Sequence, residues 1–310
     1  MGEKEGFISF QNLTKKFGNN LVLNNLDLTI KREGIFGIMG LSGSGKTTLL
    51  NILVNFWKPD SGKILYNGLE ISKHQHVFNQ FFGFGTQAGS LYPKLTVREN
   101  MIYFGKMYNM KKSDIDKRIT ELLEFVDMKK SEETIAEELS TGMYRRLDIA
   151  CALIHTPKIL VLDEPTGNLD PVLRKRILAL IKKIDDEGTK VIITSHLMGE
   201  AEDICDELAI LHKGKIIAQD APENLIEKYS KEEIIKFETN THDYNALIAG
   251  LKTIGAKEVF QKRKYMYLYT PDAEETLYKL ITLLKQKNQK LINIEVNKPK
   301  IEEVFESLTR

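Results

Sequence analysis

The sequence predicts an α/β protein built around a parallel sheet. Residues 34–39, 158–162 and 190–194 are short continuous apolar runs, which is typical of strands buried on both faces of a sheet. Helical patterns follow from Pro171 and from Leu197. Strands that alternate with helices in this way indicate a parallel sheet covered by helices.

Two further segments flank this core in the first two thirds of the chain. Residues 7–13 and 26–30 alternate apolar and polar side chains, which predicts half-buried antiparallel strands. Residues 98–153 carry apolar side chains at spacings of three and four, which predicts a mainly helical insert. Within it, Ser113 and Asp116 form a candidate helix-capping pair.

The pattern changes after about residue 222. The remaining residues predict, in order, a strand, a helix, two strands, a helix and a strand. This order matches a ferredoxin-like module, although it also fits a generic small α+β domain. We therefore expect two domains, residues 1–222 and 223–310, with a helical subdomain at about 90–155 inside the first.

Composition argues against several classes of protein. The chain has 44 basic and 43 acidic residues, a net charge of +1, so nucleic acid is not an expected partner. Cys151 and Cys205 lack metal-ligand spacing and are expected to be reduced core thiols, as in a cytosolic protein. The N-terminus lacks a secretory signal, and no run reaches the roughly 18 apolar residues that a membrane span needs. Any link to a membrane is expected to come through another protein.

A phosphate-binding loop directly follows the apolar run at 34–39. It fits the pattern G-x-x-x-x-G-K-[ST], whose glycines free backbone N–H groups to surround phosphate oxygens at a helix N-terminus. Lysine in this pattern supplies a fixed positive charge, and the final hydroxyl binds Mg²⁺. The loop predicts that the chain binds a nucleoside triphosphate together with Mg²⁺. The residues expected to contact the nucleotide here are Gly40, Leu41, Ser42, Gly43, Ser44, Gly45, Lys46, Thr47 and Thr48.

A second motif is the apolar strand that ends in Asp163 and Glu164. A buried strand would bring Asp163 to the edge of the sheet beside the phosphate loop, where it can hold Mg²⁺ together with Thr47. Glu164 would then polarise the attacking water, a role that contributes on the order of 10²- to 10⁴-fold in rate. Such an acid pair alone also fits a simple turn cap, and the upstream loop favours catalysis.

A third motif begins with Ser140 and Gly142, a good helix N-cap that opens an apolar-periodic helix. With these motifs in this order, residues 7 to 220 resemble the ATP-binding subunits of ABC transporters. The resemblance implies a P-loop NTPase core of the RecA-like type that binds ATP and Mg²⁺. One departure is Thr141, which stands where the family often has glycine; a β-branched side chain there would resist a positive φ.

The resemblance implies further site residues. Gln87 stands in the position of the family's glutamine loop, which contacts Mg²⁺ and the nucleotide, and His196 in that of its late histidine. Lys46, Glu164 and His196 are the expected catalytic residues. Phe17 is placed where the family stacks an aromatic ring on adenine, although it also fits a core position in a strand.

The resemblance also implies that two copies, identical or paralogous, meet head to tail. Ser140, Gly142 and Asp170 of one subunit would then contact the ATP bound by the other. Asp170, which precedes Pro171, is in addition a sound helix N-cap.

The expected machine is an ATPase on the cytoplasmic face of the membrane that energises a separate transmembrane permease. Residues 300–309 resemble the tail of ATPases that serve drug, polysaccharide or sodium exporters, which favours export. The alternatives are a non-transport ABC-type ATPase, a kinase with a similar loop, and a nucleotide-dependent regulator that does not turn over. The role of residues 223–310 is hypothesised to be subunit pairing or regulation.

Overall fold

The protein is described by a computed structural model that covers residues 7–229, 232–242, 244–297 and 300–309. The chain divides into two compact units, Met1–Pro222 and Glu223–Arg310, called unit 1 and unit 2 below. Within the described residues no helix is both long and apolar enough to cross a membrane.

Unit 1 begins with an antiparallel sheet in the strand order β2-β1-β4-β5. Its strands are β1 (Ile8–Phe17), β2 (Asn20–Ile30), β4 (Ser61–Tyr66) and β5 (Leu69–Glu70). Its first two strands form a hairpin, which confirms the antiparallel strands that the alternating pattern predicted, and their inward residues, such as Phe10 and Leu28, are buried.

The second sheet of unit 1 is mainly parallel and has the order β10-β9-β3-β8-β7-β6. Its strands are β3 (Phe36–Met39), β6 (Phe82–Gly85), β7 (Ile159–Asp163), β8 (Lys190–Ser195), β9 (Glu207–His212) and β10 (Lys215–Asp220). Only the β9–β10 pair is antiparallel among these pairings. The carboxyl ends of β3, β7 and β8 therefore meet at one edge, where the phosphate loop begins.

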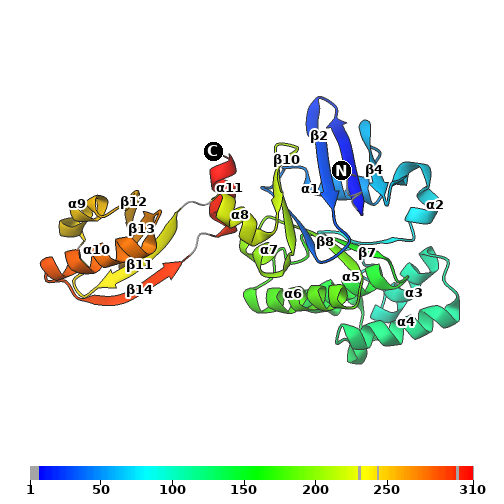
Figure 1. Cartoon of the computed structure of the whole chain (residues 1–310). Coiled ribbons are helices and arrows are strands. Elements are labelled where there is room, and N and C mark those ends of the chain that lie inside the picture. The colour runs from blue at the N-terminus through cyan, green and yellow to red at the C-terminus, as the bar shows by residue number, and fades with distance from the viewer. Residues whose placement is uncertain (1–6, 230–231, 243, 298–299, 310) are drawn as a thin grey trace. The chain divides into compact units, whose positions relative to one another are not determined.

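Helices cover the parallel sheet. Unit 1 contains α1 (Lys46–Leu53), α2 (Gln75–Phe78), α3 (Val97–Met107), α4 (Lys112–Phe125), α5 (Thr141–Leu153), α6 (Pro171–Asp186) and α7 (Met198–Ile204). Short 3₁₀ turns occur at Ile71–Lys73, Lys129–Ser131 and Ala136–Glu138. Because α1 contacts both β2 and β7, it lies between the two sheets (Figure 1). Helix α5 contacts β6, and α6 contacts β8.

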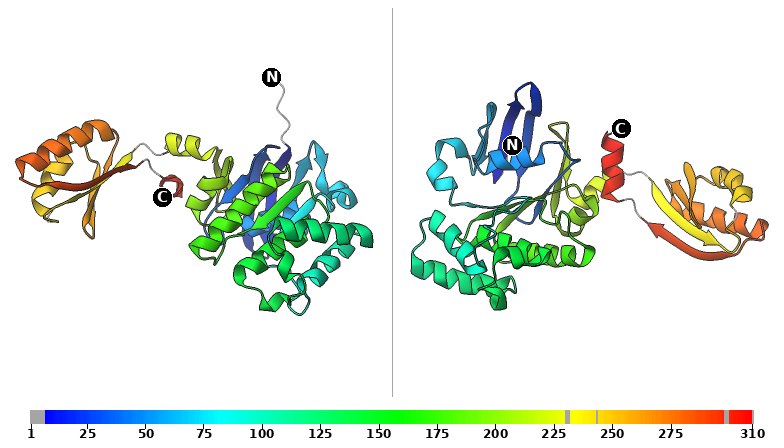
Figure 2. Two further views of the ribbon diagram at one scale, coloured as in Figure 1. Left: turned by 90° about the horizontal axis from the view of Figure 1, so that it is seen from below. Right: turned by 180° about the vertical axis from the view of Figure 1, so that it is seen from behind.

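The helical insert consists of α3, α4 and the first part of α5. The three helices contact one another and lie together at one end of unit 1 (Figure 2). The prediction that Ser113 and Asp116 cap a helix is wrong, because α4 already begins at Lys112 and Ser113 lies in its first turn. The side-chain cap is found at α3 instead, where Thr96 and Glu99 exchange hydrogen bonds with each other's backbone N–H groups.

Unit 2 begins within α8 (Pro222–Tyr229). Its elements are β11 (Glu233–Thr239), α9 (Asn245–Thr253), β12 (Glu258–Lys262), β13 (Tyr265–Thr270), α10 (Ala273–Gln286), β14 (Leu291–Asn297) and α11 (Ile301–Thr309). The sheet is antiparallel with the order β12-β13-β11-β14, which is the ferredoxin-like arrangement. Buried residues of this sheet, such as Phe237 and Leu268, pack with those of α9 and α10, such as Leu247 and Leu280, in a core of their own.

Candidate nucleotide site

The phosphate loop connects β3 to α1 and depends on its glycines. Gly45, the N-cap of α1, has φ 109°, a conformation that L side chains rarely adopt. A Cβ atom added to it would lie 3.0 Å from Leu23 and 3.2 Å from the carbonyl oxygen of Val22. One added to Gly40 would lie 2.6 Å from the hydroxyl of Ser44. The loop thus needs glycine at both ends to keep its N–H groups close to a ligand.

Lys46 is the first residue of α1, and its side chain is almost fully buried. Its ammonium group donates to the carbonyl oxygens of Gly40, at 2.9 Å, and Leu41, at 3.2 Å. The same nitrogen lies 3.4 Å from Oε1 of Glu164. The lysine therefore places one positive charge between the phosphate loop and the end of β7.

Asp163 is the last residue of β7 and is held by two hydroxyl groups. Thr47 donates to its Oδ2 at 2.7 Å, and Thr194 of the neighbouring strand β8 donates to its Oδ1 at 2.6 Å. The hydroxyl of Thr194 also accepts from the backbone N–H of Glu164 at 3.0 Å. A single threonine thus fixes both acidic residues, and Asp163 and Thr47 together present oxygen atoms of the kind that Mg²⁺ prefers.

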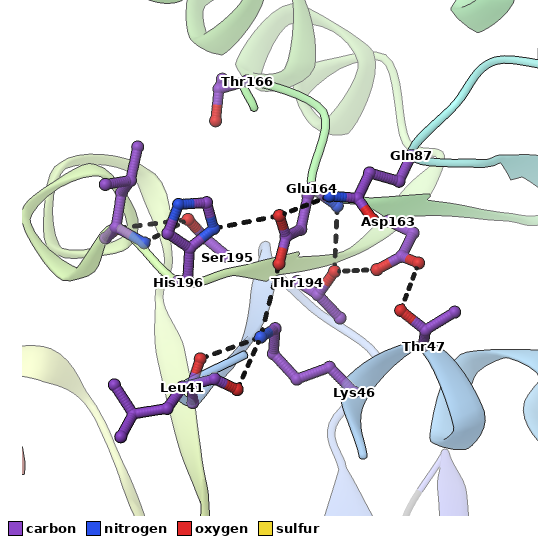
Figure 3. A network of polar contacts seen from close by, with 12 residues as sticks. Leu41, Lys46, Thr47, Gln87, Asp163, Glu164, Thr166, Thr194, Ser195 and His196 are labelled. Carbon is purple, nitrogen blue, oxygen red and sulfur yellow. Dashed lines mark hydrogen bonds and ion pairs between the residues drawn. The ribbon is translucent and has the colours of Figure 1, made fainter. Parts of the chain in front are cut away.

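Three donors converge on the carboxylate of Glu164 (Figure 3). Besides Lys46 on Oε1, Gln87 donates to Oε2 at 3.0 Å, and Nδ1 of His196 lies 3.0 Å from the same oxygen. Because a carboxylate only accepts, Nδ1 of His196 carries a hydrogen in this contact. Glu164 also has φ 47°, which costs a non-glycine residue roughly 1–2 kcal/mol and aims its side chain at this junction.

A cavity of about 490 Å³ joins these groups. It is lined by Asn20, Val22, Ser42, Gly43, Gly45, Lys46, Thr47, Thr48, Gln87, Glu164 and His196. Most of the residues that the sequence predicted to meet ATP within one subunit are therefore brought together. Leu41 takes part through its carbonyl oxygen rather than its exposed side chain, while Ser44 is buried beneath the loop.

Other predicted residues lie outside this cavity. Phe17 is not among its lining residues; its ring packs edge-on against Trp57, with centroids 5.1 Å apart, under the ammonium group of Lys15. Its role at adenine stays a prediction. The residues expected to act on a second subunit's ATP are also elsewhere.

Ser140 and Asp170 are helix N-caps, of α5 and α6. The hydroxyl of Ser140 accepts from the N–H of Met143, and the carboxylate of Asp170 accepts from the N–H groups of Val172 and Leu173. Gly142 is buried in the first turn of α5 against Leu173, where a Cβ atom would approach that side chain to 2.8 Å.

Thr141 does not have the positive φ that a β-branched side chain would resist. It is the first residue of α5 and is absent from the described non-glycine residues that have positive φ. A β-branched residue is readily accommodated at such a helical position, so the departure from glycine introduces no backbone strain here.

Sequence reasoning missed Thr194, Asn20 and Val22. Thr194 could have been found, because it precedes Ser195 and His196 at the carboxyl end of a buried strand, where polar side chains gather. The two residues of β2 reach the cavity only through the packing of the hairpin over the phosphate loop, for which the sequence holds no local signal.

Comparisons with known proteins agree with this geometry. The family model described as ABC transporter matches residues 23–167. The linearmycin resistance ATP-binding protein LnrL of Bacillus subtilis is 30% identical, over 96% of this chain and 97% of its own length. The Nod factor export ATP-binding protein I of Rhizobium sp. strain N33 is 33% identical, over 97% of this chain and 96% of its own length. The chain belongs to the ABC transporter ATP-binding proteins.

Solved structures of ABC ATP-binding proteins have the same fold as unit 1. One, cbiO1 of Clostridium perfringens, part of the ABC transporter complex cbiONQ, is 25% identical with a TM-score of 0.66, covering 73% of this chain and 92% of its own. A dimeric ATP-binding cassette in a post-hydrolysis state with ADP and Pi is 28% identical with a TM-score of 0.62, covering 69% and 98%. This ABC ATPase therefore binds ATP and hydrolyses it to drive transport.

Proposed function

We propose that this ABC ATPase hydrolyses Mg²⁺–ATP with Glu164 as the residue that polarises the attacking water. The observation that carries the proposal is the convergence of Lys46, Gln87 and His196 on that carboxylate in the lining of the cavity. When nucleotide is bound, the ammonium group of Lys46 can turn to its phosphates, which leaves Glu164 free to accept a proton from water.

The oxygen atoms of Thr47, Asp163 and Gln87 fit a Mg²⁺ ion. They combine a hydroxyl, a carboxylate and an amide carbonyl, all hard oxygen donors, near the expected phosphates. The ion would neutralise charge on the phosphates, while Thr194 keeps Asp163 oriented from behind.

Replacing Glu164 tests this assignment. Glu164→Gln keeps the shape of the side chain but removes the base, so we expect kcat to fall by about 10²- to 10⁴-fold while ATP still binds. The matched control is Glu124→Gln on α4, at an exposed position remote from the cavity. Turnover by Glu164→Gln at the wild-type rate, with ATP binding intact, would assign the proton transfer to another group.

We further propose that two copies complete each ATP site head to tail. Ser140, Gly142 and Asp170 lie outside the cavity of their own subunit, which suits residues that serve a partner's nucleotide. ATP would favour the closed dimer because its γ-phosphate gains contacts from both subunits only there. We expect Glu164→Gln, which retains ATP, to elute as a dimer with Mg²⁺–ATP, and Ser140→Arg in the same background to elute as a monomer.

A separate transmembrane permease is the proposed membrane partner, which would hold the ATPase at the cytoplasmic face. A second cavity, of about 550 Å³, is lined by Val54, Asn55, Phe56, Asn79, Gln80, Phe82, Phe84, Met107, Tyr108 and Asn109. Phe56 and Met107 are 73% and 62% exposed, so apolar side chains and amides surround an open groove next to the helical insert. Such a groove fits a short amphipathic segment of the permease.

A charge in the groove tests this contact. We expect Phe56→Asp to lower the fraction of the ATPase that sediments with membranes in cells that also make the permease, while isolated ATPase activity is kept. Tyr278→Asp, at an exposed position of α10, serves as the control. Equal membrane recovery of both variants would place the permease contact elsewhere.

Export is the proposed direction, because two relatives that match nearly the whole chain are named for linearmycin resistance and for Nod factor export. These matches include unit 2, for which we propose a role in subunit pairing or regulation. A truncation after Pro222 that leaves ATPase activity, dimerisation and transport all unchanged would refute that role.

A further inference from the structure

Arg145 and Asp148 of helix α5 hold the loop that carries Gln87. The guanidinium group of Arg145 donates through Nη1 to the carbonyl oxygen of Thr86 and through Nη2 to that of Gln87, both at 2.9 Å. Two parallel donors on two successive carbonyls are a geometry that only arginine offers. The main chain of Gln87 is therefore attached to α5 directly.

Asp148 lies one turn further along α5 and completes the attachment. Its Oδ1 accepts from the backbone N–H of Ser90 at 2.9 Å, and its Oδ2 lies 3.6 Å from Nη1 of Arg145. The side chain of Asp148 is almost fully buried, and that of Arg145 is only 12% exposed. Buried charge pairs of this kind lose much when one partner is removed, because the other is left unpaired.

Tyr144 supports the same loop from the same turn of α5. Its ring lies against Gly89, where an added Cβ atom would come within 2.6 Å of the ring. Gly89 has φ 79°, and its N–H closes a turn onto the carbonyl oxygen of Thr86. The loop is thus a tight turn fitted to α5 at several points, and it has little room to move independently of that helix.

Helix α5 carries functional groups of two different sites. Its N-cap is Ser140, which we propose contacts the ATP of a second subunit. Five residues later, Arg145 holds Gln87, whose side chain reaches Glu164 of its own subunit at 3.0 Å. A displacement of the N-terminal end of α5 would therefore shift Gln87 relative to β7 and the Asp163–Glu164 pair.

We propose that Arg145, supported by Asp148, is a positioning residue that links the Ser140 end of α5 to Gln87. When Ser140 of one subunit contacts the ATP bound by its partner, α5 would thereby set the position of Gln87 in the first subunit's own site. The link rests on the proposed head-to-tail dimer. Through it, the geometry of each ATP site depends on whether the other site holds ATP.

Arg146 provides a matched control on the same helix turn. Its guanidinium group donates to the carbonyl oxygens of Val126 and Asp127, at 2.9 and 3.1 Å, at the end of α4. These hydrogen bonds reach the end of α4 and not the loop that carries Gln87. Arg146→Gln therefore removes the same charge from α5 without touching Gln87.

The test is a pair of double-mutant cycles on steady-state ATPase activity of the full chain. We expect Arg145→Gln to lower kcat by roughly tenfold with a KM for ATP within about twofold of wild type. In a Gln87→Ala background the same substitution should cost less than about twofold, because the residue it positions is gone. The effect of Ser140→Ala on kcat should likewise shrink in Arg145→Gln, whereas Arg146→Gln should be additive with both.

Each outcome decides one part of the inference. An Arg145→Gln effect of equal size with and without Gln87 overturns the positioning role. Coupling to Gln87 together with additivity to Ser140 overturns the link between sites. Arg145→Lys, which retains the charge but offers no fork, is expected to behave as Arg145→Gln and serves if the latter does not fold. If the wild-type protein itself neither dimerised with ATP nor hydrolysed it, that result would instead contradict the proposed function.

Discussion

The hydroxyl of Thr194 organises the two acidic residues more than any other single group in the site. It donates to Asp163 and accepts from the N–H of Glu164, and its side chain is fully buried. A residue that fills the same space without a hydroxyl would leave a carboxylate oxygen and an N–H group unsatisfied, at a cost of about 1–3 kcal/mol each.

We therefore predict that Thr194→Val lowers kcat by about tenfold or more, because Asp163 and Glu164 lose the hydroxyl group that holds them both. The Mg²⁺ concentration needed for half-maximal activity should rise as well. Thr194→Ser keeps the hydroxyl and should stay within about threefold of wild type. Titrating ATPase activity with Mg²⁺ measures both. Comparable losses in the two variants would show that shape, and not the hydrogen bonds, matters at this position.

Two buried titratable residues of unit 1 affect stability in opposite directions as pH changes. Burial raises the pKa of Asp148 to about 6, an effect that the N–H of Ser90 and the charge of Arg145 oppose. Burial lowers the pKa of His155 to about 4, and the nearby charge of Arg118 acts in the same direction. Each pKa thus shifts in the direction that favours the neutral form of its group.

For Asp148, the folded state keeps a proton between about pH 4 and 6 that the unfolded chain has lost, so its stabilising contribution is lost as pH rises through that range. We predict that Asp148→Asn becomes more stable relative to wild type as pH increases from 4.5 to 6.5. Urea unfolding midpoints at several pH values measure this difference. A constant difference across that range would contradict the raised pKa.

For His155, the unfolded chain binds a proton below about pH 6.5 while the folded ring, stacked on Tyr108, stays neutral down to about pH 4. Its presence therefore destabilises the protein as pH falls through this window. We predict that His155→Gln, which can still donate to the carbonyl oxygen of Phe82, loses less stability on acidification than wild type. The same urea titration checks it, and parallel losses would refute it.

At the scale of single elements, α3 and α4 show how different helix starts can be. Thr96 and Glu99 form a complete capping box at α3, whereas α4 begins after Lys111 without a side-chain cap. We predict that Thr96→Ala lowers the free energy of unfolding by about 1 kcal/mol. Ser113→Ala, in the first turn of α4, should change it by less than about 0.5 kcal/mol. Chemical denaturation of the full chain measures both. An equal loss in the two variants would mean that Ser113 caps α4, as the sequence suggested.

The elements that could be predicted are those whose pattern is local. The buried runs that became β3, β7 and β8 have the length and apolar composition of parallel strands, and the helix starts at Lys46 and Pro171 carry clear signals. The phosphate loop and the two acidic residues could be located for the same reason, because each is a contiguous motif.

Other features depend on contacts between distant segments and could not be predicted. Strand β6 has the sequence Phe-Gly-Phe-Gly, which has weak strand preference, and it forms because it pairs with β7. Gly83 in it is required by the close approach of the Ala152 carbonyl group of α5. The attachment of the Gln87 loop to Arg145 is likewise visible only once α5 is placed.

At the scale of the whole molecule, the two units have separate hydrophobic cores. The core of unit 1 runs through both of its sheets and α1, with residues such as Leu13, Leu49 and Ile192. The core of unit 2 contains residues such as Phe237, Leu268 and Leu280. A defect in one core should therefore destabilise one unit more than the other.

We predict that Leu280→Ala, at a fully buried position of α10, lowers the stability of unit 2 by about 2–5 kcal/mol and leaves the unfolding of unit 1 in place. Leu13→Ala, an equally buried residue of β1, should have the reverse effect. Calorimetry should then show one of two thermal transitions moving in each variant, with the nucleotide-sensitive one moving only in Leu13→Ala, because ATP binds to unit 1. If Leu280→Ala lowered both transitions together, the two units would unfold as one cooperative body, and unit 2 would contribute directly to the stability of the ATP site.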